Sequence, residues 1–403
     1  RLGGIDYAWL YANPIDAPVV ELLDRRARAG DALLVRSDSG LARGVAAPGG
    51  TAPDLIVRAF EPDAPAEDIV VQAEAALASP RAWYVRYDDT FARAGLRAAD
   101  QAIARGSQVL AEHRYQGVSV RLLLAAGRLG AGGRAPDSVR GLDAVFDSSL
   151  RLRSVRLPAS AAWGRPLGID FDWLAQGPVD RDLTVFVHLL GPDGRRVAQI
   201  DASIVDEDMR PTSQWPVGTE VRGQAYALLP PGTPAVTHTL RLGMYDGHTG
   251  ERLAATVGGQ PVPEGALDLQ LPVRWQIYQP EVEDLGLDVV VQRPIPSGRG
   301  LELELLGLAR TSPVEGGGTA GLDLLWHVLA PPATPPALRL TISDAAGRTV
   351  GDTIQEDLVP GLPAADWPAG KVVRTHAEVP IDGRALAGAG RLLVGLLEGG
   401  ESG

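Results

Sequence analysis

The chain of 403 residues has no cysteine, a single lysine, two methionines and few aromatic side chains. Without cysteine it can form no disulfide, use no thiolate nucleophile and hold no cysteine-ligated zinc or iron–sulfur centre. No run of about 18 apolar residues occurs, because Arg121 and Arg128 interrupt the longest candidate near 118–126, so the sequence as given predicts no membrane-spanning helix. The absence of disulfides leaves the cellular compartment open.

Positive charge is also scarce. The 50 acidic residues outnumber the 38 basic ones, giving a net charge of −12, and no basic run is interleaved with aromatic residues. Nucleic acid is therefore not an expected partner, and an acidic surface is repelled by anionic lipid headgroups. With 45% apolar and 22% charged residues the composition is that of a globular protein. The length exceeds what one hydrophobic core serves, so we expect three domains.

The most informative feature that the sequence does contain is an internal repeat. The segment 168–173, Gly-Ile-Asp-Phe-Asp-Trp, returns at 321–326 as Gly-Leu-Asp-Leu-Leu-Trp, and a Gly-Arg pair and then a Trp-Pro pair follow each copy. Beyond the Trp-Pro pairs the spacing is identical. Offsets of 3, 7 and 28 lead from Trp215 to Gly218, Arg222 and Gly243, and from Trp367 to Gly370, Arg374 and Gly395. Such ordered matches predict a duplicated module.

The first 125 residues alternate helical and extended patterns. We predict helices over 17–29, 66–78 and 91–105, and strands over 32–36, 54–60, 81–87, 108–113 and 118–124. Strands separated by helices of this length favour a mostly parallel, three-layer sheet. The prediction for residues 1–126 is a small α/β Rossmann-like domain.

Two glycine-rich stretches in this region are candidate phosphate loops. Gly130, Gly132 and Ala135 fit a loose Gly-x-Gly-x-x-Ala spacing, but Pro136 stands where a phosphate-binding helix should begin. We therefore interpret 127–141 as a linker. The stretch 40–50 lacks the Gly-Lys-Ser/Thr ending of a phosphate loop and is predicted to be a flexible surface loop. No cofactor is assigned.

From residue 142 onward short strands alternate with turns, and no helical pattern occurs. Ile169, Phe171 and Trp173 alternate with aspartates, which is typical of a strand with one solvated face. Trp173 and its counterpart Trp326 are predicted to lie in cores. We predict two tandem, duplicated antiparallel β-sandwich domains of Ig-like type, 142–274 and 275–403.

The ends of the sequence suggest a fragment. The chain begins at Arg1 with neither a methionine nor a signal-peptide pattern, and the second copy stops at a turn where the first continues into another strand. We expect the chain to be part of a longer polypeptide, with the second sandwich truncated.

Four residues are candidates for glycan contact. Trp215 and Trp367 each precede a proline and a turn glycine, where a ring can either cap the sandwich core or lie exposed as a platform for a sugar. The core cap is the favoured alternative, because the position recurs in both copies. Tyr245 and Asp246 complete the candidate glycan-binding set.

Evidence for a metal or catalytic site is weaker. Asp201, Asp206, Glu207 and Asp208 crowd one loop and offer oxygen ligands to calcium, but they lack an EF-hand spacing. His238 and His248 have no third ligand at a suitable spacing and are interpreted as surface histidines. No Gly-x-Ser-x-Gly nucleophile elbow occurs, although a dispersed Ser-His-Asp set stays open. We assign no catalytic and no metal-binding residue.

Several segments resemble a known family. They are 16–36, with a helix ending in Arg-Ala-Gly-Asp before an apolar strand, together with 180–195, 211–218 and 241–246. These segments look like the soluble C-terminal region of bacterial membrane glycosyltransferases related to the dolichyl-phosphate-mannose protein mannosyltransferases, which are of the GT-C type. The resemblance implies a parent enzyme that takes sugar from a polyprenyl-phosphate donor with an acidic residue between its early membrane helices. Those helices lie outside this sequence, so no catalytic residue is carried over.

Two functional hypotheses follow. In the first, the chain is the non-catalytic extracytoplasmic portion of such an enzyme, attached to the membrane through an N-terminal part, and its sandwiches contact glycan or acceptor or assemble with neighbouring chains. In the second, it is a cell-surface structural or adhesive protein built of stacked β-sandwiches. A free nucleotide-sugar enzyme built on the N-terminal domain is a third, weaker hypothesis. The first two place the chain in the cell envelope or at the cell surface.

Overall fold

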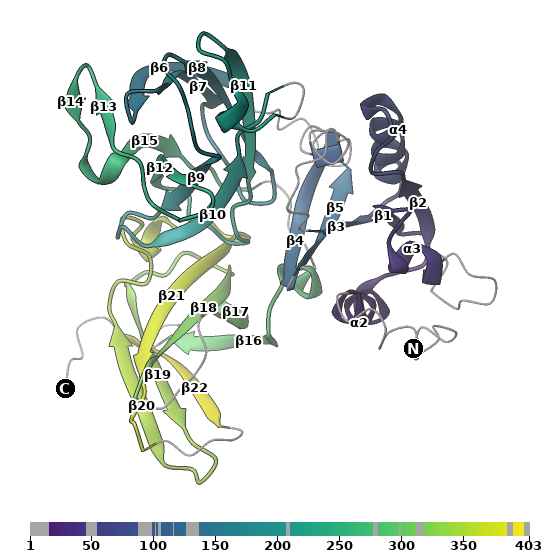
Figure 1. Ribbon diagram of the computed structural model, residues 1–403. Coiled ribbons are helices and arrows are strands. Elements are labelled where there is room, and N and C mark those ends of the chain that lie inside the picture. The colour runs from purple at the N-terminus through teal and green to yellow at the C-terminus, as the bar shows by residue number, and fades with distance from the viewer. Residues whose placement is uncertain are drawn as a thin grey trace. The chain divides into compact units, whose positions relative to one another are not determined.

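The protein is mostly strand, and most of its strand pairs are antiparallel (Figure 1). The computed structural model describes residues 16–45, 55–87, 99–100, 102–103, 106–115, 117–125, 137–206, 210–276, 281–297, 300–311, 317–384 and 390–398. Its contacts divide the chain into two compact units. The first contains 1–190, 196–229 and 238–272, and the second contains 191–195, 230–237 and 273–403.

The N-terminal region contains a mixed five-stranded sheet. Its helices are α2 (Ala17–Arg26), α3 (Gly40–Val45) and α4 (Ala66–Leu77), and its strands are β1 (Ala32–Arg36), β2 (Ile56–Phe60), β3 (Ala82–Tyr87), β4 (Ser107–Tyr115) and β5 (Val118–Ala125). The strand order is β2-β1-β3-β5-β4 (Figure 1). The strand β1 runs parallel to β2 and β3, whereas β5 runs antiparallel to β3 and β4. Half of the pairings are therefore antiparallel, because β4 and β5 form a hairpin.

Most predicted elements of this region are confirmed within a few residues. The helix α2 begins with a proline in its first turn, where the missing N–H has no helical partner. The two arginines at the end of α2, and Glu67 and Asp68 in the first turn of α4, suit the helix dipole. The predicted helix 91–105 lies largely outside the described residues. None of the helices in the described part of the chain is both long and apolar enough to cross a membrane.

The predicted surface loop at 40–50 is wrong for its first half. Residues 40–45 form α3, whose Leu41 and Ala42 are buried. Ser39 allows this because its hydroxyl donates to the Arg36 carbonyl oxygen at 2.6 Å and accepts the Ala42 N–H at 3.1 Å. That serine caps the helix, so Gly40 and Gly44 belong to a helix and not to an open loop.

Two antiparallel sheets follow, as in a β-sandwich. Their strands are β6 (Asp137–Phe146), β7 (Leu150–Pro158), β8 (Leu167–Ala175), β9 (Leu183–Leu190), β10 (Arg196–Ser203), β11 (Glu220–Ala227), β12 (Thr237–Asp246), β13 (Ala255–Val257), β14 (Gln260–Pro261) and β15 (Ala266–Pro272). The sheet orders are β11-β8-β7-β6-β13-β14 and β10-β9-β12-β15. The strand β6 already begins at Asp137, inside the segment predicted as a linker.

The second unit contains a smaller pair of sheets. Its strands are β16 (Val289–Ser297), β17 (Gly300–Arg310), β18 (Thr319–Val328), β19 (Pro336–Ser343), β20 (Thr349–Gln355), β21 (Val372–Pro380) and β22 (Arg391–Glu398), in the orders β16-β17-β18-β21 and β20-β19-β22. Side chains of both sheets form one core, which includes Leu305, Trp326, Leu338 and Leu340.

The two pairs of sheets correspond strand by strand. The order β11-β8-β7-β6 matches β21-β18-β17-β16, and β10-β9-β12 matches β20-β19-β22. Register agrees too, since Trp173 of β8 pairs with Val221 and Trp326 of β18 pairs with Val373. Because Val221 and Val373 each lie six positions after Trp215 and Trp367, the sequence repeat and the strand pairing coincide.

A shared backbone irregularity strengthens this correspondence. In β6 the pairing with β7 shifts between Gly141 and Ala144, and in β16 the pairing with β17 shifts between Val290 and Arg293. Each shift contains a non-glycine residue in the left-handed region, Asp143 at φ 50° and Gln292 at φ 47°. Such residues are uncommon. Two independent strands would not be expected to place them at the same β-bulge.

The two core tryptophans differ in one hydrogen bond. The indole N–H of Trp326 donates to the Thr375 hydroxyl at 3.0 Å. Gly223 stands at the position of Thr375 in the first pair of sheets, and the indole nitrogen of Trp173 has no hydrogen-bond partner there. A Cβ atom on Gly223 would lie 3.1 Å from that nitrogen, so the glycine gives the indole ring room.

Replacing Thr375 by valine should therefore destabilise the second unit. Valine keeps the shape of threonine but leaves the buried Trp326 N–H unpaired, which costs about 1–3 kcal/mol. Denaturant unfolding followed by tryptophan fluorescence measures the loss. Thr375→Ser is the control, because it keeps the hydroxyl and should retain most of the stability. Equal losses in the two variants would assign the effect to packing.

Candidate functional site

Trp215 and Trp367 occupy matching buried positions. The exposed fractions of the residues are 4% and 0%, and each follows a short 3-10 turn, Thr212–Gln214 or Ala364–Asp366. Each indole N–H donates to the carbonyl oxygen five residues earlier, that of Arg210 at 2.9 Å and that of Leu362 at 3.1 Å. This geometry fits the core-cap alternative. A sugar could stack on either ring only if the ring were first uncovered.

Replacing either ring by alanine should cost stability. Trp215→Ala and Trp367→Ala each remove a large buried side chain, and we expect losses of about 3–5 kcal/mol. Equilibrium denaturation of the two single variants measures them. Unchanged unfolding of Trp215→Ala combined with loss of oligosaccharide binding would instead identify the ring as a platform.

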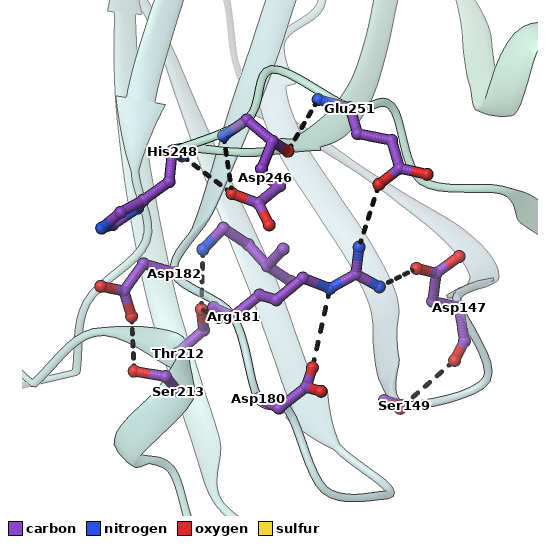
Figure 2. Close-up of polar contacts among 12 residues, drawn as sticks. Asp147, Ser149, Asp180, Arg181, Asp182, Thr212, Ser213, Asp246, His248 and Glu251 are labelled. Carbon is purple, nitrogen blue, oxygen red and sulfur yellow. Dashed lines mark hydrogen bonds and ion pairs between the residues drawn. The ribbon is translucent and has the colours of Figure 1, made fainter.

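The loops around Arg181 form an ionic cluster in the first unit, which Figure 2 shows. Its guanidinium lies 2.5 Å from an Asp147 carboxylate oxygen, 3.6 Å from Asp180 and 3.9 Å from Glu251. Asp147 also accepts the Ala254 N–H at 3.2 Å. The four charged residues come from three different loops, so the arginine ties these loops together.

Hydroxyl and backbone groups complete this cluster. The Thr212 hydroxyl donates to the Arg181 carbonyl oxygen at 2.6 Å and accepts the Leu183 N–H at 2.8 Å, while Ser213 donates to the Asp182 carboxylate at 2.5 Å (Figure 2). The side chains therefore hold the β8–β9 loop and the 3-10 turn in place. These contacts indicate a structural role.

Asp246, one of the four glycan-contact candidates, belongs to the same end of the sheets. Its carboxylate accepts the backbone N–H groups of His248 at 2.8 Å and Thr249 at 3.1 Å (Figure 2). Those hydrogen bonds lower the pKa of Asp246. The carboxylate is thus charged at neutral pH and stabilises the turn after β12.

The described residues of the acidic loop considered for calcium bind other side chains of the protein. Asp206 holds Arg210, with a carboxylate oxygen 2.7 Å from the guanidinium Nε, and Asp201 accepts a hydrogen bond from Gln199. Glu207 and Asp208 lie outside the described residues. Within the described part of the chain, no group of three or more histidine or acidic side chains is placed to hold a metal ion.

Tyr245 points to a different environment from its neighbour Asp246. It lies on the outward face of the β10-β9-β12-β15 sheet, with its ring centroid 6.5 Å from that of Phe186, and the His188 ring lies 4.8 Å from Phe186 on the other side. We call Phe186, His188 and Tyr245 the aromatic face. Phe186 is buried at its centre, whereas His188 and Tyr245 are half-buried.

Gly243 makes room for the aromatic face. It pairs with Phe186 across the strands, and a Cβ atom there would lie 2.5 Å from the phenylalanine ring. The Arg252 guanidinium covers the ring from outside, 4.9 Å from its centroid. Phe186 is therefore packed between the backbone of Gly243 and the guanidinium of Arg252. The rings of His188 and Tyr245 lie on either side of it.

Charged groups border the aromatic face. Arg241 makes a bidentate ion pair with Asp268, in which both hydrogen bonds measure 2.8 Å. The Glu264 carboxylate lies 3.7 Å from the guanidinium groups of both Arg241 and Arg252. Burial and the neighbouring Asp201 carboxylate raise the pKa of Tyr245, so its hydroxyl keeps its proton. Burial lowers the pKa of His188, which leaves its imidazole neutral at neutral pH.

The matching face of the second unit is not aromatic. Gly243 pairs with Phe186 in the first unit, and the matching Gly395 pairs with Arg339 in the second. Aligned in this way, the counterparts of Phe186, His188 and Tyr245 are Arg339, Thr341 and Leu397. Arg339 makes an ion pair with Asp352 at 3.0 Å. The strands thus keep the same pairing while the outward side chains differ in kind.

A second charged cluster lies between β18 and β21 of the second unit. One Asp323 carboxylate oxygen lies 2.6 Å from the Arg374 guanidinium, and the other lies 2.7 Å from His376 Nδ1. Burial favours the protonated form of Asp323, but the His376 hydrogen bond and the Arg374 charge outweigh it and lower the pKa of the carboxyl. In the first unit Asp170 and Gln224 occupy the positions of Asp323 and His376, joined by a hydrogen bond at 3.0 Å.

This cluster should make the second unit sensitive to acid. A carboxylate whose pKa is lowered by folding stabilises the protein above its ordinary pKa, and that contribution is lost as the pH falls through the lowered value. Asp323→Asn should reduce the acid-induced loss below about pH 4 and cost about 3–5 kcal/mol at pH 7, because the buried Arg374 loses the carboxylate that balances its charge. Unfolding at several pH values measures both effects. The exposed Asp357→Asn is the control, and a pH profile changed equally by both variants would contradict this assignment.

Sequence reasoning placed Tyr245 and Asp246 together, but the structure separates their side chains. It missed Phe186 and His188, although a signal was present: in the alternating strand 183–190 the valines face inward, which turns these two rings outward. His238, predicted to lie on the surface, is buried, whereas His248 is exposed as predicted. The pairing of Asp323 with His376 depends on strand register, which the sequence alone does not give.

Comparison of the sequence with protein-family models found no match, and comparison with curated proteins found none either.

Proposed function

We propose that this chain is a non-catalytic, glycan-contacting part of an extracytoplasmic membrane glycosyltransferase that uses polyprenyl-phosphate sugar. The observation that carries the glycan contact is the aromatic face on the outward side of β9 and β12. The link to the glycosyltransferase comes from the sequence resemblance, which is a separate and weaker support.

The chemistry of the aromatic face suits a neutral sugar. Half-exposed tyrosine and uncharged histidine rings offer apolar edges and faces to the C–H groups of a pyranose. Asp201, Asp268 and Arg241 offer hydrogen-bond acceptors and donors to its hydroxyl groups. Rings fixed by packing against Phe186 lose little conformational freedom when they bind a ligand.

We also propose an Ig-like duplication in the second half of the chain and a Rossmann-like fold for the N-terminal region. The second half is an Ig-like module copied once, supported by the matching strand orders, the matching tryptophan register and the shared bulge. The N-terminal region is Rossmann-like, supported by the three parallel strands in the order β2-β1-β3 and by α4 between β2 and β3. After a duplication, an aromatic face present in only one copy points to a role acquired by that copy.

The aromatic face can be tested with His188→Ala and Tyr245→Ala. We expect the chain to bind at least one of three probes, mannohexaose, cellohexaose or maltohexaose, and each variant to weaken that binding about tenfold, equivalent to ~1.4 kcal/mol. Titration calorimetry, with NMR chemical shifts to locate the contact, measures it. Thr341→Ala is the matched control, since Thr341 occupies the position of His188 in the second unit.

Unchanged affinity in both aromatic variants, or an equal loss in Thr341→Ala, would contradict the assignment of glycan contact to this face. The membrane part of the proposal has its own test. About ten apolar segments of spanning length in the reading frame upstream of Arg1 would support it, and a cleavable signal peptide alone would contradict it.

A further inference from the structure

The two half-buried rings of the aromatic face are too far apart to share one sugar. His188 is two positions after Phe186 on β9, and Tyr245 of β12 pairs with Thr184, two positions before Phe186. Four residues of an antiparallel strand span about 13 Å. The Phe186 ring lies between the two, with its centroid 4.8 Å from His188 and 6.5 Å from Tyr245. A single pyranose, which is similar in size to one aromatic ring, can therefore contact only one of them.

The His188 ring has polar side chains on both sides. His188 pairs with Arg241 of β12 and with Gln199 of β10. Directly paired residues of antiparallel strands project from the same face of the sheet. Arg241 is held in place by its bidentate ion pair with Asp268. A sugar on His188 thus meets guanidinium and amide donors and a carboxylate acceptor.

The Tyr245 ring has a separate set of polar neighbours. Thr184, which pairs with Tyr245, pairs on its other side with Ser203 of β10. Asp201 lies beside the Tyr245 hydroxyl. Hydroxyl and carboxylate groups therefore surround this ring, as guanidinium and amide groups surround the other. Each ring is equipped to bind a sugar unit of its own.

Arg252 occupies the space between the two rings. Its guanidinium lies 4.9 Å from the centroid of Phe186, which is only 3% exposed and offers no face for stacking. The Arg252 side chain is itself 49% exposed, and its contact with Glu264 is long, at 3.7 Å. Its N–H groups can therefore donate to oxygen atoms of a ligand that crosses from one ring to the other.

We propose that the aromatic face binds two consecutive units of a neutral linear glycan, one on His188 and one on Tyr245, with the linkage beside Arg252. This inference rests on the proposed glycan contact and specifies its ligand, for which the smallest complete form is a disaccharide. The second unit binds in an intramolecular step once the first is bound, so a linked pair binds more tightly than a single sugar.

The length of the ligand tests this arrangement. Titrations followed by NMR chemical shifts, on the full 403-residue chain, compare the mono-, di- and hexasaccharide of whichever series binds: mannose, cellobiose-type or maltose-type. We expect the disaccharide to bind at least about tenfold more tightly than the monosaccharide. The hexasaccharide should gain only about fivefold more, because a chain of about six units offers about five positions to a two-unit site.

His188→Ala and Tyr245→Ala separate the two positions. Each should lower the disaccharide affinity about tenfold, close to the monosaccharide value, and change the monosaccharide affinity by no more than about twofold, because the other ring remains. The double variant should bind neither. Thr341→Ala, at the position of His188 in the second unit, is the matched control and should leave all affinities unchanged. The length series on the unmodified chain is independent of how well the variants fold.

The possible contrary results are distinguishable. Equal affinity for the mono- and disaccharide, or a disaccharide affinity that either single variant leaves unchanged, would overturn the two-unit arrangement and leave the glycan contact intact. A hexasaccharide that binds far more tightly than the five positions allow would overturn it too, because the site would then extend beyond two units. Failure of all three hexasaccharides to bind would overturn the glycan contact and this inference together.

Discussion

Burial of a tryptophan against a matched pair of strands is the interaction on which the second half of this protein depends. Trp173 and Trp326 each face inward from a central strand and lie opposite a valine of the next strand. Trp215 and Trp367 close the same cores from a 3-10 turn, each held by a hydrogen bond to the carbonyl oxygen five residues earlier. Large aromatic rings in these positions fix the register of the strands, because a slip of one residue would turn each ring toward solvent.

With the register fixed, the outward side chains are free to differ. One unit carries an aromatic face covered by Arg252, and the other carries an arginine–aspartate pair at the same place. The polar clusters beside these strands differ too, since a hydrogen bond between Asp170 and Gln224 in the first unit corresponds to the contact of Asp323 with His376 in the second. On the proposal of a duplicated module, the shared core is the older feature, and the differing faces are where the two units acquired separate roles.

Much of the fold could be predicted from the sequence. The alternation of Ile169, Phe171 and Trp173 with aspartates predicts a strand with one solvated face, and β8 (Leu167–Ala175) has that burial pattern. The strands β6, β15 and β16 were missed. A bulge with a left-handed residue interrupts the alternation of β6 and β16. In β15 leucines alternate with polar residues, so its signal was present in the sequence and was overlooked.

The candidate site was harder to predict. Tyr245 and Asp246 are neighbours in sequence, but the period of two in a strand sends their side chains to opposite sides. Phe186 and His188 reach Tyr245 only through the pairing of β9 with β12, and this long-range register is not encoded in any local pattern. Asp206 offers an oxygen ligand in the sequence, but in the structure its carboxylate binds Arg210 four residues further on.

The central claim is that two modules of one topology stand in series and that their inner structure is shared while their outer faces differ. An experimental structure of the chain tests it most directly, by superposition of residues 137–246 on residues 289–398. The account predicts the same order of the seven matching strands, coincident indole rings of Trp173 with Trp326, and left-handed backbone at both Asp143 and Gln292. Different strand orders, or tryptophans in unrelated surroundings, would contradict it.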